Sequence, residues 1–350
     1  MNISIVGTVG LPGNYGGFES LVENLVLNRS EAVDYHVFCS KVAYTMFVDD
    51  FNGAKLTYIP LKANGVQSIP YDICSLISCI RRKPDIVLIL GVSGCLFLPI
   101  YKLFSRSKII TNIDGLEWKR DKWGFFTKKF LKISEHFAVH YSDEVITDNQ
   151  AITDYVLSEY NVISHTIAYG GDHAIRDGKV NVTQENYALA LCRIEPENNV
   201  DMILDSFSKS KVPLKFIGNW HHSEFSKALL AKYNEFENIE MMAPIYDLDT
   251  LYTIRSNCKV YIHGHSAGGT NPSLVEMMHF GIPILAFDCV FNRYSTEGKA
   301  DYFKDSVALT KLIDDFSMEI NTGEGVIMKK IAEKKYTWEI IASKYEALFI

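Results

Sequence analysis

Two glycine-rich segments of the sequence suit the binding of an anion. The first, Gly7–Gly17, follows the apolar run Ile3–Val6 and leads into a predicted helix from Phe18. Glycines let the backbone approach a ligand closely, and the N–H groups at a helix N-terminus attract phosphate. The alternative is a flexible connection between a strand and a helix. A nicotinamide cofactor is rejected, because the Gly-x-Gly-x-x-Gly spacing is absent and the second predicted strand ends in Cys39-Ser40 rather than in an acidic residue.

The second segment, His263–Glu276, carries a more specific pattern. It follows the predicted strand Val260–His263 and opens a predicted helix that runs to Phe280. Pro272 fits the first turn of that helix, where its missing N–H costs nothing. Glu276 lies about one turn further in, within reach of a sugar hydroxyl beside the anion. Donors for a diphosphate would come from four consecutive residues, Gly268, Gly269, Thr270 and Asn271.

Arg193 offers a cation just after the predicted strand Ala188–Leu191. A guanidinium at a strand end can make charge-assisted hydrogen bonds with phosphate. An ordinary surface arginine would look the same in the sequence. The prediction that Arg193 binds an anion therefore depends on the two glycine segments. Together, three features that suit an anion follow predicted strands.

A pair of carboxylates beside an indole follows another predicted strand, Lys108–Asn112. Asp114, Glu117 and Trp118 are close neighbours in the chain. Carboxylates accept hydrogen bonds from sugar hydroxyls, and an aromatic face can stack on the C–H surface of a sugar. The segment therefore predicts a carbohydrate contact. The alternative is an Asp-Gly turn that leads into a helix.

Metal sites are not expected. Asp247 and Asp249 form an Asp-x-Asp pattern, but Asp247 is better placed to cap the helix predicted from Leu248. The histidines of the pairs His221-His222 and His263/His265 lack a carboxylate at ligand spacing.

These residues need a scaffold, and the order of predicted elements indicates an α/β fold. Short β-rich runs, several of them apolar on both sides, alternate with helical segments along the chain. This alternation predicts doubly wound parallel sheets with helices on both faces. The alternation pauses at 172–186 and then restarts, which predicts two Rossmann-like domains whose ligands bind beyond the carboxyl ends of the strands. We expect domains at 1–172 and 173–336, and an amphipathic helix at 337–350 that packs back toward the first domain.

Length and composition agree with two globular domains. The 350 residues include 47% hydrophobic and 22% charged residues, and the net charge of −7 argues against a nucleic-acid partner. The odd number of cysteines, seven, without a Cys-x-x-Cys pair, indicates a reducing compartment. The sequence shows no signal peptide and no apolar run of the roughly 20 residues that span a membrane, so we expect a cytoplasmic protein.

These motifs together carry a resemblance. The chain resembles GT-B glycosyltransferases of the large retaining family 4 and, within it, the bacterial rhamnosyltransferase-like subgroup of polysaccharide assembly. The similarity covers nearly the whole chain. The matching segments are 7–19, Asp114–Trp118 with Lys119-Arg120, Arg193–Asn199 and His263–Glu276.

The resemblance implies a role for each motif. Gly16 and Gly17 would pack against the donor diphosphate, Arg193 would pair with it, and the Gly268–Asn271 turn would bind it. Glu276 would hold the nucleotide ribose, while Asp114, Glu117 and Trp118 would belong to the acceptor side. The two α/β domains would face a central cleft, and no metal or other cofactor would be needed.

The sequence departs from the broad family at two positions. The family has two glutamates separated by seven residues, and the first of these is Gly268 here. The carboxylate that ordinarily contacts the donor-sugar hydroxyls is therefore absent at this position. The lysine usually found five residues after the arginine is Asn198 here, so Arg193 must supply more of the charge that neutralises the diphosphate.

The implied activity is the transfer of a sugar, most simply L-rhamnose from dTDP-L-rhamnose, onto a lipid-linked saccharide. The product would feed a capsule, an O-antigen lipopolysaccharide or a cell-wall polysaccharide. Retention is implied by the family: the departing phosphate oxygen accepts the proton of the acceptor on the same face, and Asp114 and Glu117 orient the acceptor. The alternatives are a hexosyltransferase that uses a UDP-sugar, a nucleotide-sugar epimerase of the same fold, and a non-enzymatic, membrane-docked assembly subunit.

The segment Lys119–Ile133 predicts contact with a membrane surface. Its six basic residues outnumber its one acidic residue, Asp121, and aromatic residues lie between them. Such a pattern suits anionic lipid headgroups. We expect a peripheral protein on the inner face of the bacterial cytoplasmic membrane. The alternative is a solvated helix face whose aromatic residues pack into the first domain.

Overall fold

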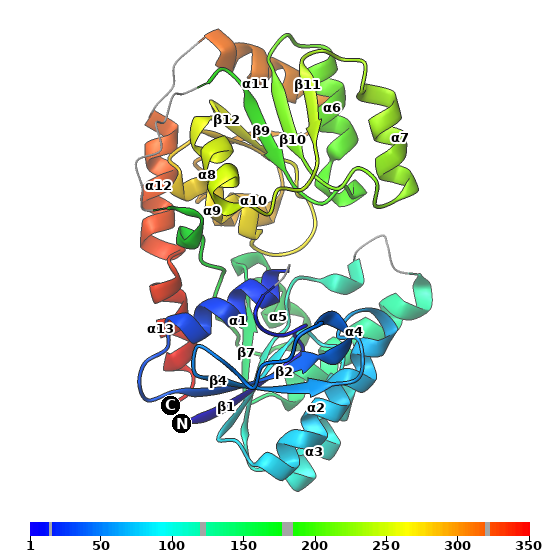
Figure 1. Ribbon diagram of the computed structural model, residues 1–350, viewed down its shortest axis with the longest axis vertical. Helices are drawn as coiled ribbons and strands as arrows, with labels where there is room; N and C mark the ends of the chain where they lie inside the picture. Colours follow the sequence, from blue (N-terminus) through cyan, green and yellow to red (C-terminus); the bar gives the residue numbers. More distant parts are fainter. Residues whose placement is uncertain (14–15, 120–123, 177–184, 319–322) are drawn as a thin grey trace. The chain divides into compact units, whose positions relative to one another are not determined.

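The computed structural model describes residues 1–13, 16–119, 124–176, 185–318 and 323–350. These residues form two compact units, drawn in Figure 1. Unit 1 comprises Met1–Tyr169 and Trp338–Ile350, and unit 2 comprises Gly170–Thr337. The first stretch of unit 1 ends three residues before the expected boundary at 172, and its second stretch begins one residue after the expected 337.

Unit 1 is built on a twisted sheet that, within the described residues, has eight strands in the order β3-β4-β2-β1-β5-β6-β7-β8. All neighbouring strands are parallel except β3 and β4. The central strands are buried on both faces, as their continuous apolar sequences require. The strands are β1 (Asn2–Val6), β2 (Asp34–Ser40), β3 (Asp50–Phe51), β4 (Ala54–Ile59), β5 (Ile86–Leu90), β6 (Lys108–Asn112), β7 (Glu144–Thr147) and β8 (His165–Thr166).

Helices connect these strands, and the last helix of the chain joins them. α13 (Trp338–Ala347) packs against α1, and the segment after it lies beside β2, where Phe349 meets the ring of Tyr35 edge-on. The residues that follow unit 2 in the sequence therefore complete the core of unit 1. The other helices are α1 (Gly17–Leu27), α2 (Ser68–Arg82), α3 (Leu98–Phe104), α4 (Phe125–Tyr141) and α5 (Gln150–Tyr160).

Unit 2 repeats the architecture on a smaller scale. In its described part, six parallel strands lie in the order β11-β10-β9-β12-β13-β14. The strands are β9 (Ala188–Leu191), β10 (Leu214–Ile217), β11 (Ile239–Met242), β12 (Val260–His263), β13 (Ile284–Phe287) and β14 (Asp301–Phe303). Its helices are α6 (Val200–Ser208), α7 (Glu224–Tyr233), α8 (Leu248–Asn257), α9 (Pro272–His279), α10 (Val290–Ser295), α11 (Ser306–Met318) and α12 (Gly323–Lys335).

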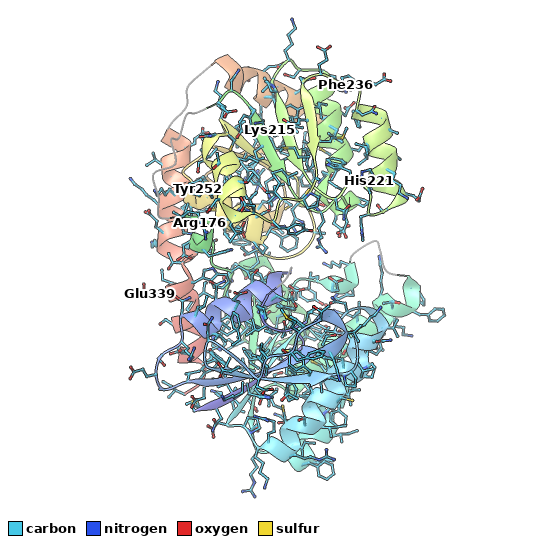
Figure 2. All side chains as sticks on the ribbon, in the orientation of Figure 1. Arg176, Lys215, His221, Phe236, Tyr252 and Glu339 are labelled. Carbon is cyan, nitrogen blue, oxygen red and sulfur yellow. The ribbon has the colours of Figure 1, made fainter. Side chains whose placement is uncertain are left out.

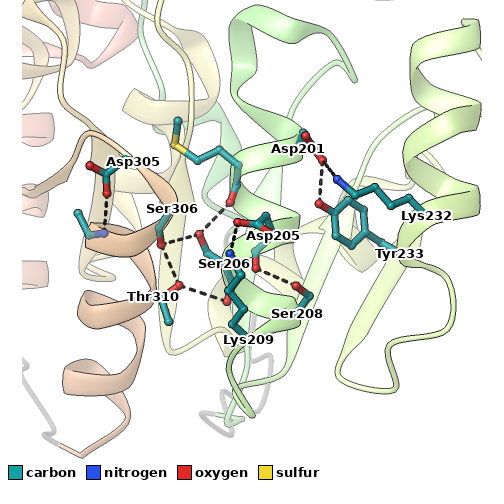
Figure 3. Close-up of polar contacts among 12 residues, drawn as sticks. Asp201, Asp205, Ser206, Ser208, Lys209, Lys232, Tyr233, Asp305, Ser306 and Thr310 are labelled. Carbon is teal, nitrogen blue, oxygen red and sulfur yellow. Dashed lines mark hydrogen bonds and ion pairs between the residues drawn. The ribbon is translucent and has the colours of Figure 1, made fainter.

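Polar contacts fasten α6 to its neighbours over the apolar core of unit 2 (Figure 3). The Ser206 hydroxyl donates to the carbonyl oxygen of Ser306 at the start of α11 (3.1 Å). On the other side, Asp201 accepts hydrogen bonds from Lys232 (2.9 Å) and from the hydroxyl of Tyr233 (2.7 Å). These contacts fix the helix that follows Arg193.

The predicted fold class is confirmed: the chain has two doubly wound, Rossmann-like α/β domains. Strands such as Lys108–Asn112 and Ala188–Leu191 have the predicted ends. The short strands β3 and β14 and the helices α3, α10, α11 and α12 were not predicted from the sequence. The two strands are only two and three residues long, too short for a hydrophobic period to appear.

Candidate functional site

The topology of unit 2 brings two of the predicted features to neighbouring strand ends. β9 pairs with β10 on one side and with β12 on the other. From β9 the chain adds β10 and β11 on one side and then crosses to add β12, β13 and β14 on the other, so the strand order switches between β9 and β12. Ligands of open α/β sheets bind at such a point. Arg193 follows β9, and the Gly268–Asn271 turn lies between β12 and α9.

The side chain of Asn198 links the loop after β9 to the loop after β12 by hydrogen bonds. Its amide nitrogen donates to the carbonyl oxygen of Arg193 (2.7 Å), and its amide oxygen accepts from Nδ1 of His265 (2.8 Å). An amide oxygen cannot donate, so His265 must carry a proton on Nδ1. Asn198 is 4% exposed. At the position where the resemblance implies a lysine, this chain thus has a buried amide that holds two loops together instead of a cation.

Arg193 is open to solvent at this edge. Its side chain is 47% exposed, and its Nε lies 3.8 Å from a carboxylate oxygen of Glu195. An ion pair at that distance and exposure contributes little. The guanidinium can therefore turn to an incoming anion at small cost.

The Gly268–Asn271 turn shapes the N-terminus of α9. Gly268 has φ of 124°, a conformation that only glycine adopts readily. Asn271 caps the helix, because its side-chain oxygen accepts from the backbone N–H (3.0 Å) and the hydroxyl (2.7 Å) of Ser273. Pro272 occupies the first turn, as predicted. The side-chain oxygen of Asn271 is thus engaged in the fold, and the binding of diphosphate by this turn, including Gly269 and the buried Thr270, stays a prediction.

Glu276 lies between two basic side chains, and its own side chain is 14% exposed. One carboxylate oxygen pairs with the Nη2 of Arg255, and the other lies 3.4 Å from Nε2 of His173. Burial acts to raise the pKa of Glu276, but the charge of Arg255 and the contacts with His173 outweigh it and hold the pKa below its ordinary value. Neither partner was predicted from the sequence, because both are distant from Glu276 in the chain. The predicted ribose contact of Glu276 is untested.

A small pocket of about 120 Å³ opens beside this carboxylate. Arg176, labelled in Figure 2, lies on its wall together with Arg255 and His173. The pocket walls also include Leu248 and Leu251 of α8. It thus has basic, apolar and carboxylate groups within a small volume.

In unit 1, the first glycine segment is held by carboxylates of α1. Glu19 accepts hydrogen bonds from the hydroxyl of Thr8 (3.0 Å) and the N–H of Val9 (2.7 Å), and it is 7% exposed. Gly16, the residue before α1, has φ of 144°, and a Cβ there would collide with the Glu19 carboxylate. A diphosphate at this helix end would therefore approach a like charge. The diphosphate contacts of Gly16 and Gly17 stay predictions, and this carboxylate opposes them.

Asp114 and Glu117 follow β6 at the carboxyl edge of the sheet, as the motif requires. Asp114 is partly buried and has φ of 62°, an uncommon conformation for a residue other than glycine. Its N–H donates to the side-chain oxygen of Asn112 (2.9 Å). Glu117 begins a short 3₁₀ turn, Glu117–Lys119, and is also partly buried.

Trp118 is partly buried, and both its indole N–H and its ring have partners in unit 1. Its indole N–H donates to the buried carboxylate of Glu135 (3.0 Å), and the ammonium of Lys132 lies 4.7 Å from its ring centroid. Lys119 lies over the same ring at 5.3 Å. Cation–π contacts thus occupy the ring that the sequence analysis expected to stack on a sugar. The acceptor-side role of Trp118, including stacking on a sugar, stays a prediction, and these two cations would compete with a sugar for the ring.

A further acid at this edge escaped the sequence analysis. Asp148 directly follows β7 and is 2% exposed. Burial raises the pKa of Tyr169, and the charges of Asp114, Asp148 and Glu19 raise it further, which reflects their closeness to this hydroxyl. The rule that pointed to Asp114, a polar residue after an apolar strand, would also have pointed to Asp148.

In the part of the chain that the structure describes, no cluster of three or more histidine, cysteine, aspartate or glutamate side chains has an arrangement that could hold a metal ion. Within the same ranges, no helix has the length and apolar character needed to cross a membrane.

Residues 1–172 match the family described as "Domain of unknown function (DUF1972)", and residues 172–315 match the family "Glycosyl transferases group 1". No curated protein sequence matches the chain.

Solved structures of similar fold cover both units. Sucrose-phosphate synthase from Thermosynechococcus elongatus has a TM-score of 0.82 at 12% identity, covering 99% of this chain and 98% of that one. HepE from Anabaena, in complex with UDP-glucose, has a TM-score of 0.77 at 12% identity and covers 99% of both chains. The catalytic domain of starch synthase IV from Arabidopsis thaliana, bound to ADP and acarbose, has 0.71 at 10% identity, covering 99% and 98%. The chain therefore has the GT-B fold and, with a group 1 glycosyl transferase domain in unit 2, it is a glycosyltransferase.

Proposed function

We propose that this glycosyltransferase takes its sugar from a nucleotide donor bound at the carboxyl edge of unit 2. The observation that carries the proposal is the pairing of the exposed Arg193 with the Gly268–Asn271 turn at adjacent strand ends. A guanidinium and a helix N-terminus both favour a diphosphate. The HepE structure in complex with UDP-glucose and the starch synthase IV structure bound to ADP support a nucleotide as the ligand of this fold.

The acceptor, in this proposal, is a lipid-linked saccharide that meets Asp114 and Glu117 of unit 1. Both carboxylates can orient hydroxyl groups, and neither needs to act as a base. With retention, the departing phosphate oxygen takes the acceptor proton, and the protein contributes position and electrostatic stabilisation. The product would enter a capsule, O-antigen or cell-wall polysaccharide.

For the donor we propose dTDP-L-rhamnose, within the rhamnosyltransferase-like subgroup of family 4. The second candidate is a UDP-sugar, which the complex of HepE with UDP-glucose favours. Calorimetry with dTDP-rhamnose, UDP-glucose, UDP-galactose and GDP-mannose separates the two. Tightest binding of dTDP-rhamnose supports the proposal, and preference for a UDP-sugar overturns the choice of donor. Transfer that survives a chelator supports a metal-free mechanism, and a strict need for manganese contradicts it.

We further propose that the protein docks on an anionic membrane through Lys119–Ile133. Phe125 and Phe126 are 74% and 85% exposed at the start of α4, and Lys129 is exposed beside them. Lys132 is withdrawn from this surface, because Glu135 and Glu159 pair with it. The expected contributions of Arg120, Lys122 and Trp123 lie outside the described residues.

Vesicles of phosphatidylglycerol test this docking. A Phe125→Ser/Phe126→Ser/Lys129→Glu variant should co-sediment less than wild type at low salt. A Lys209→Glu variant, changed on unit 2, is the matched control. Equal partitioning of all three proteins overturns the docking surface.

A further inference from the structure

We propose that Tyr345, in the last helix of the chain, positions the acceptor carboxylate Asp114 through the side chain of Asn112. The role given to Asp114 rests on the proposed function. The contact between the three residues does not, since it belongs to the structure of unit 1. Tyr345 is thus a positioning residue that acts through Asn112.

The relay consists of two hydrogen bonds to one amide side chain. Nδ2 of Asn112 donates to the hydroxyl of Tyr345 (2.8 Å), and Oδ1 of Asn112 accepts from the N–H of Asp114 (2.9 Å). Asn112 is 1% exposed and Tyr345 is fully buried, so water does not compete for either bond. Because an amide has a donor end and an acceptor end, the bond to Tyr345 fixes which end faces Asp114.

Asp114 needs such a bond. Its φ of 62° lies in the left-handed region, where a side chain crowds its own backbone. The bond from its N–H to Asn112 closes a local turn of the kind that asparagine side chains stabilise. Strained backbone at a functional position persists only where the surroundings hold it. The hydroxyl of Tyr345 is part of those surroundings.

Tyr345 suits this task because it stays neutral. Burial raises the pKa of its phenol, and the charges of Asp148 and Asp114 raise it further. The phenol therefore keeps its proton across the physiological range, and its oxygen accepts the bond from Asn112 in that form. Other contacts of the same C-terminal segment lie elsewhere: Glu346 accepts from the N–H of Ser30 (2.8 Å), and Lys108 donates to the carbonyl oxygen of Leu348 (2.7 Å).

The test compares Tyr345→Phe with Glu346→Ala in the full-length chain. Each variant removes one hydrogen bond that docks the C-terminal segment, but only Tyr345 touches Asn112. We expect Tyr345→Phe to lower kcat for transfer about three- to tenfold, with nucleoside diphosphate affinity unchanged. Glu346→Ala should leave kcat unchanged. Hydrogen–deuterium exchange of a peptide that covers 112–118 should speed up in Tyr345→Phe and stay as in wild type in Glu346→Ala.

Asn112→Ala breaks the same relay from its centre. The double variant Asn112→Ala/Tyr345→Phe should lose no more turnover than Asn112→Ala alone, because coupled residues are not additive. Equal kcat and equal exchange in Tyr345→Phe and Glu346→Ala overturn the relay. If wild type transfers no sugar, the proposed function fails, and the exchange comparison still decides whether the relay exists.

Discussion

The carboxyl edges of the two sheets share one architecture but differ in charge. In unit 2, Arg193 is exposed, a neutral Asn271 caps α9, and the largely buried Glu276 is matched by Arg255 and His173. In unit 1, the corresponding glycine segment donates hydrogen bonds to the carboxylate of Glu19.

The acids Asp114 and Asp148 lie near the same tyrosine, Tyr169, on this unit 1 edge. A diphosphate suits the first edge and is opposed at the second. Hydroxyl groups of a neutral sugar suit the second, because carboxylates accept their hydrogen bonds. In the proposed function, the same fold thus serves two kinds of ligand through a few side chains at the strand ends.

The largest expected change in stability comes from removing the cation that balances a carboxylate at the unit 2 edge, which makes this edge more acidic, like that of unit 1. Arg255→Met leaves the largely buried Glu276 without its main cation, and breaking a buried pair in this way costs about 3–5 kcal/mol. Urea unfolding, followed with and without nucleoside diphosphate, measures the loss. The double variant Arg255→Met/Glu276→Gln removes both charges and should recover much of the stability. A single variant as stable as the double one contradicts this account.

Arg193→Ala should weaken nucleoside diphosphate binding by about 1.5–3 kcal/mol, since it removes a charge-assisted contact. Calorimetry measures the affinity. Lys209→Ala is the matched control, because it removes an exposed cation at the other end of α6 and should change nothing. Unchanged affinity in Arg193→Ala would remove the main support for a diphosphate in unit 2.

Asp114→Asn should lower turnover about tenfold while donor affinity stays the same, because a charged acceptor of hydrogen bonds becomes a neutral one. Initial rates at saturating donor and titration with nucleotide measure the two quantities. If Asp114→Asn loses nucleotide binding but keeps acceptor binding, Asp114 belongs to the donor side and not to the acceptor side.

The ion pair of Glu276 also predicts a pH dependence. Arg255 and His173 hold the pKa of this carboxyl below its ordinary value, so the pair stabilises the fold above the unfolded pKa of about 4.3. This stability is lost as pH falls through the lower, folded pKa. Glu276→Gln should therefore be less stable than wild type at pH 7, and the difference should shrink in acid. A constant difference from pH 7 to pH 3 would contradict the shift.

The smallest effect is expected at the unit 1 glycines. A Cβ on Gly17 would lie 3.5 Å from the hydroxyl of Tyr169, an ordinary contact, so Gly17→Ala should fold normally. We expect its nucleoside diphosphate affinity to change by less than about 0.5 kcal/mol, the range of substitutions away from a site. If Gly17→Ala weakens nucleoside diphosphate binding as much as Arg193→Ala does, the diphosphate also contacts unit 1 in spite of the carboxylates there.

Local patterns predicted the scaffold but not the partners of the site residues. Strands such as Ile86–Leu90 are apolar throughout, so a few consecutive residues reveal them. Asp247 caps one helix and Pro272 occupies the first turn of another, so each marks a helix start by its residue type. Arg255 meets Glu276, and Glu135 meets Trp118, only after the chain has folded. No spacing rule links them, because these contacts depend on how helices pack.

Unit 1 is not continuous in the sequence, since 170–337 separates its first stretch from Trp338–Ile350. During translation, the ribosome must therefore finish all of unit 2 before the residues that bury Tyr35 and reach Asn112 emerge. Unit 2 can complete its own core while the nascent unit 1 still lacks a helix, which reverses the usual order in which the domain made first also folds first.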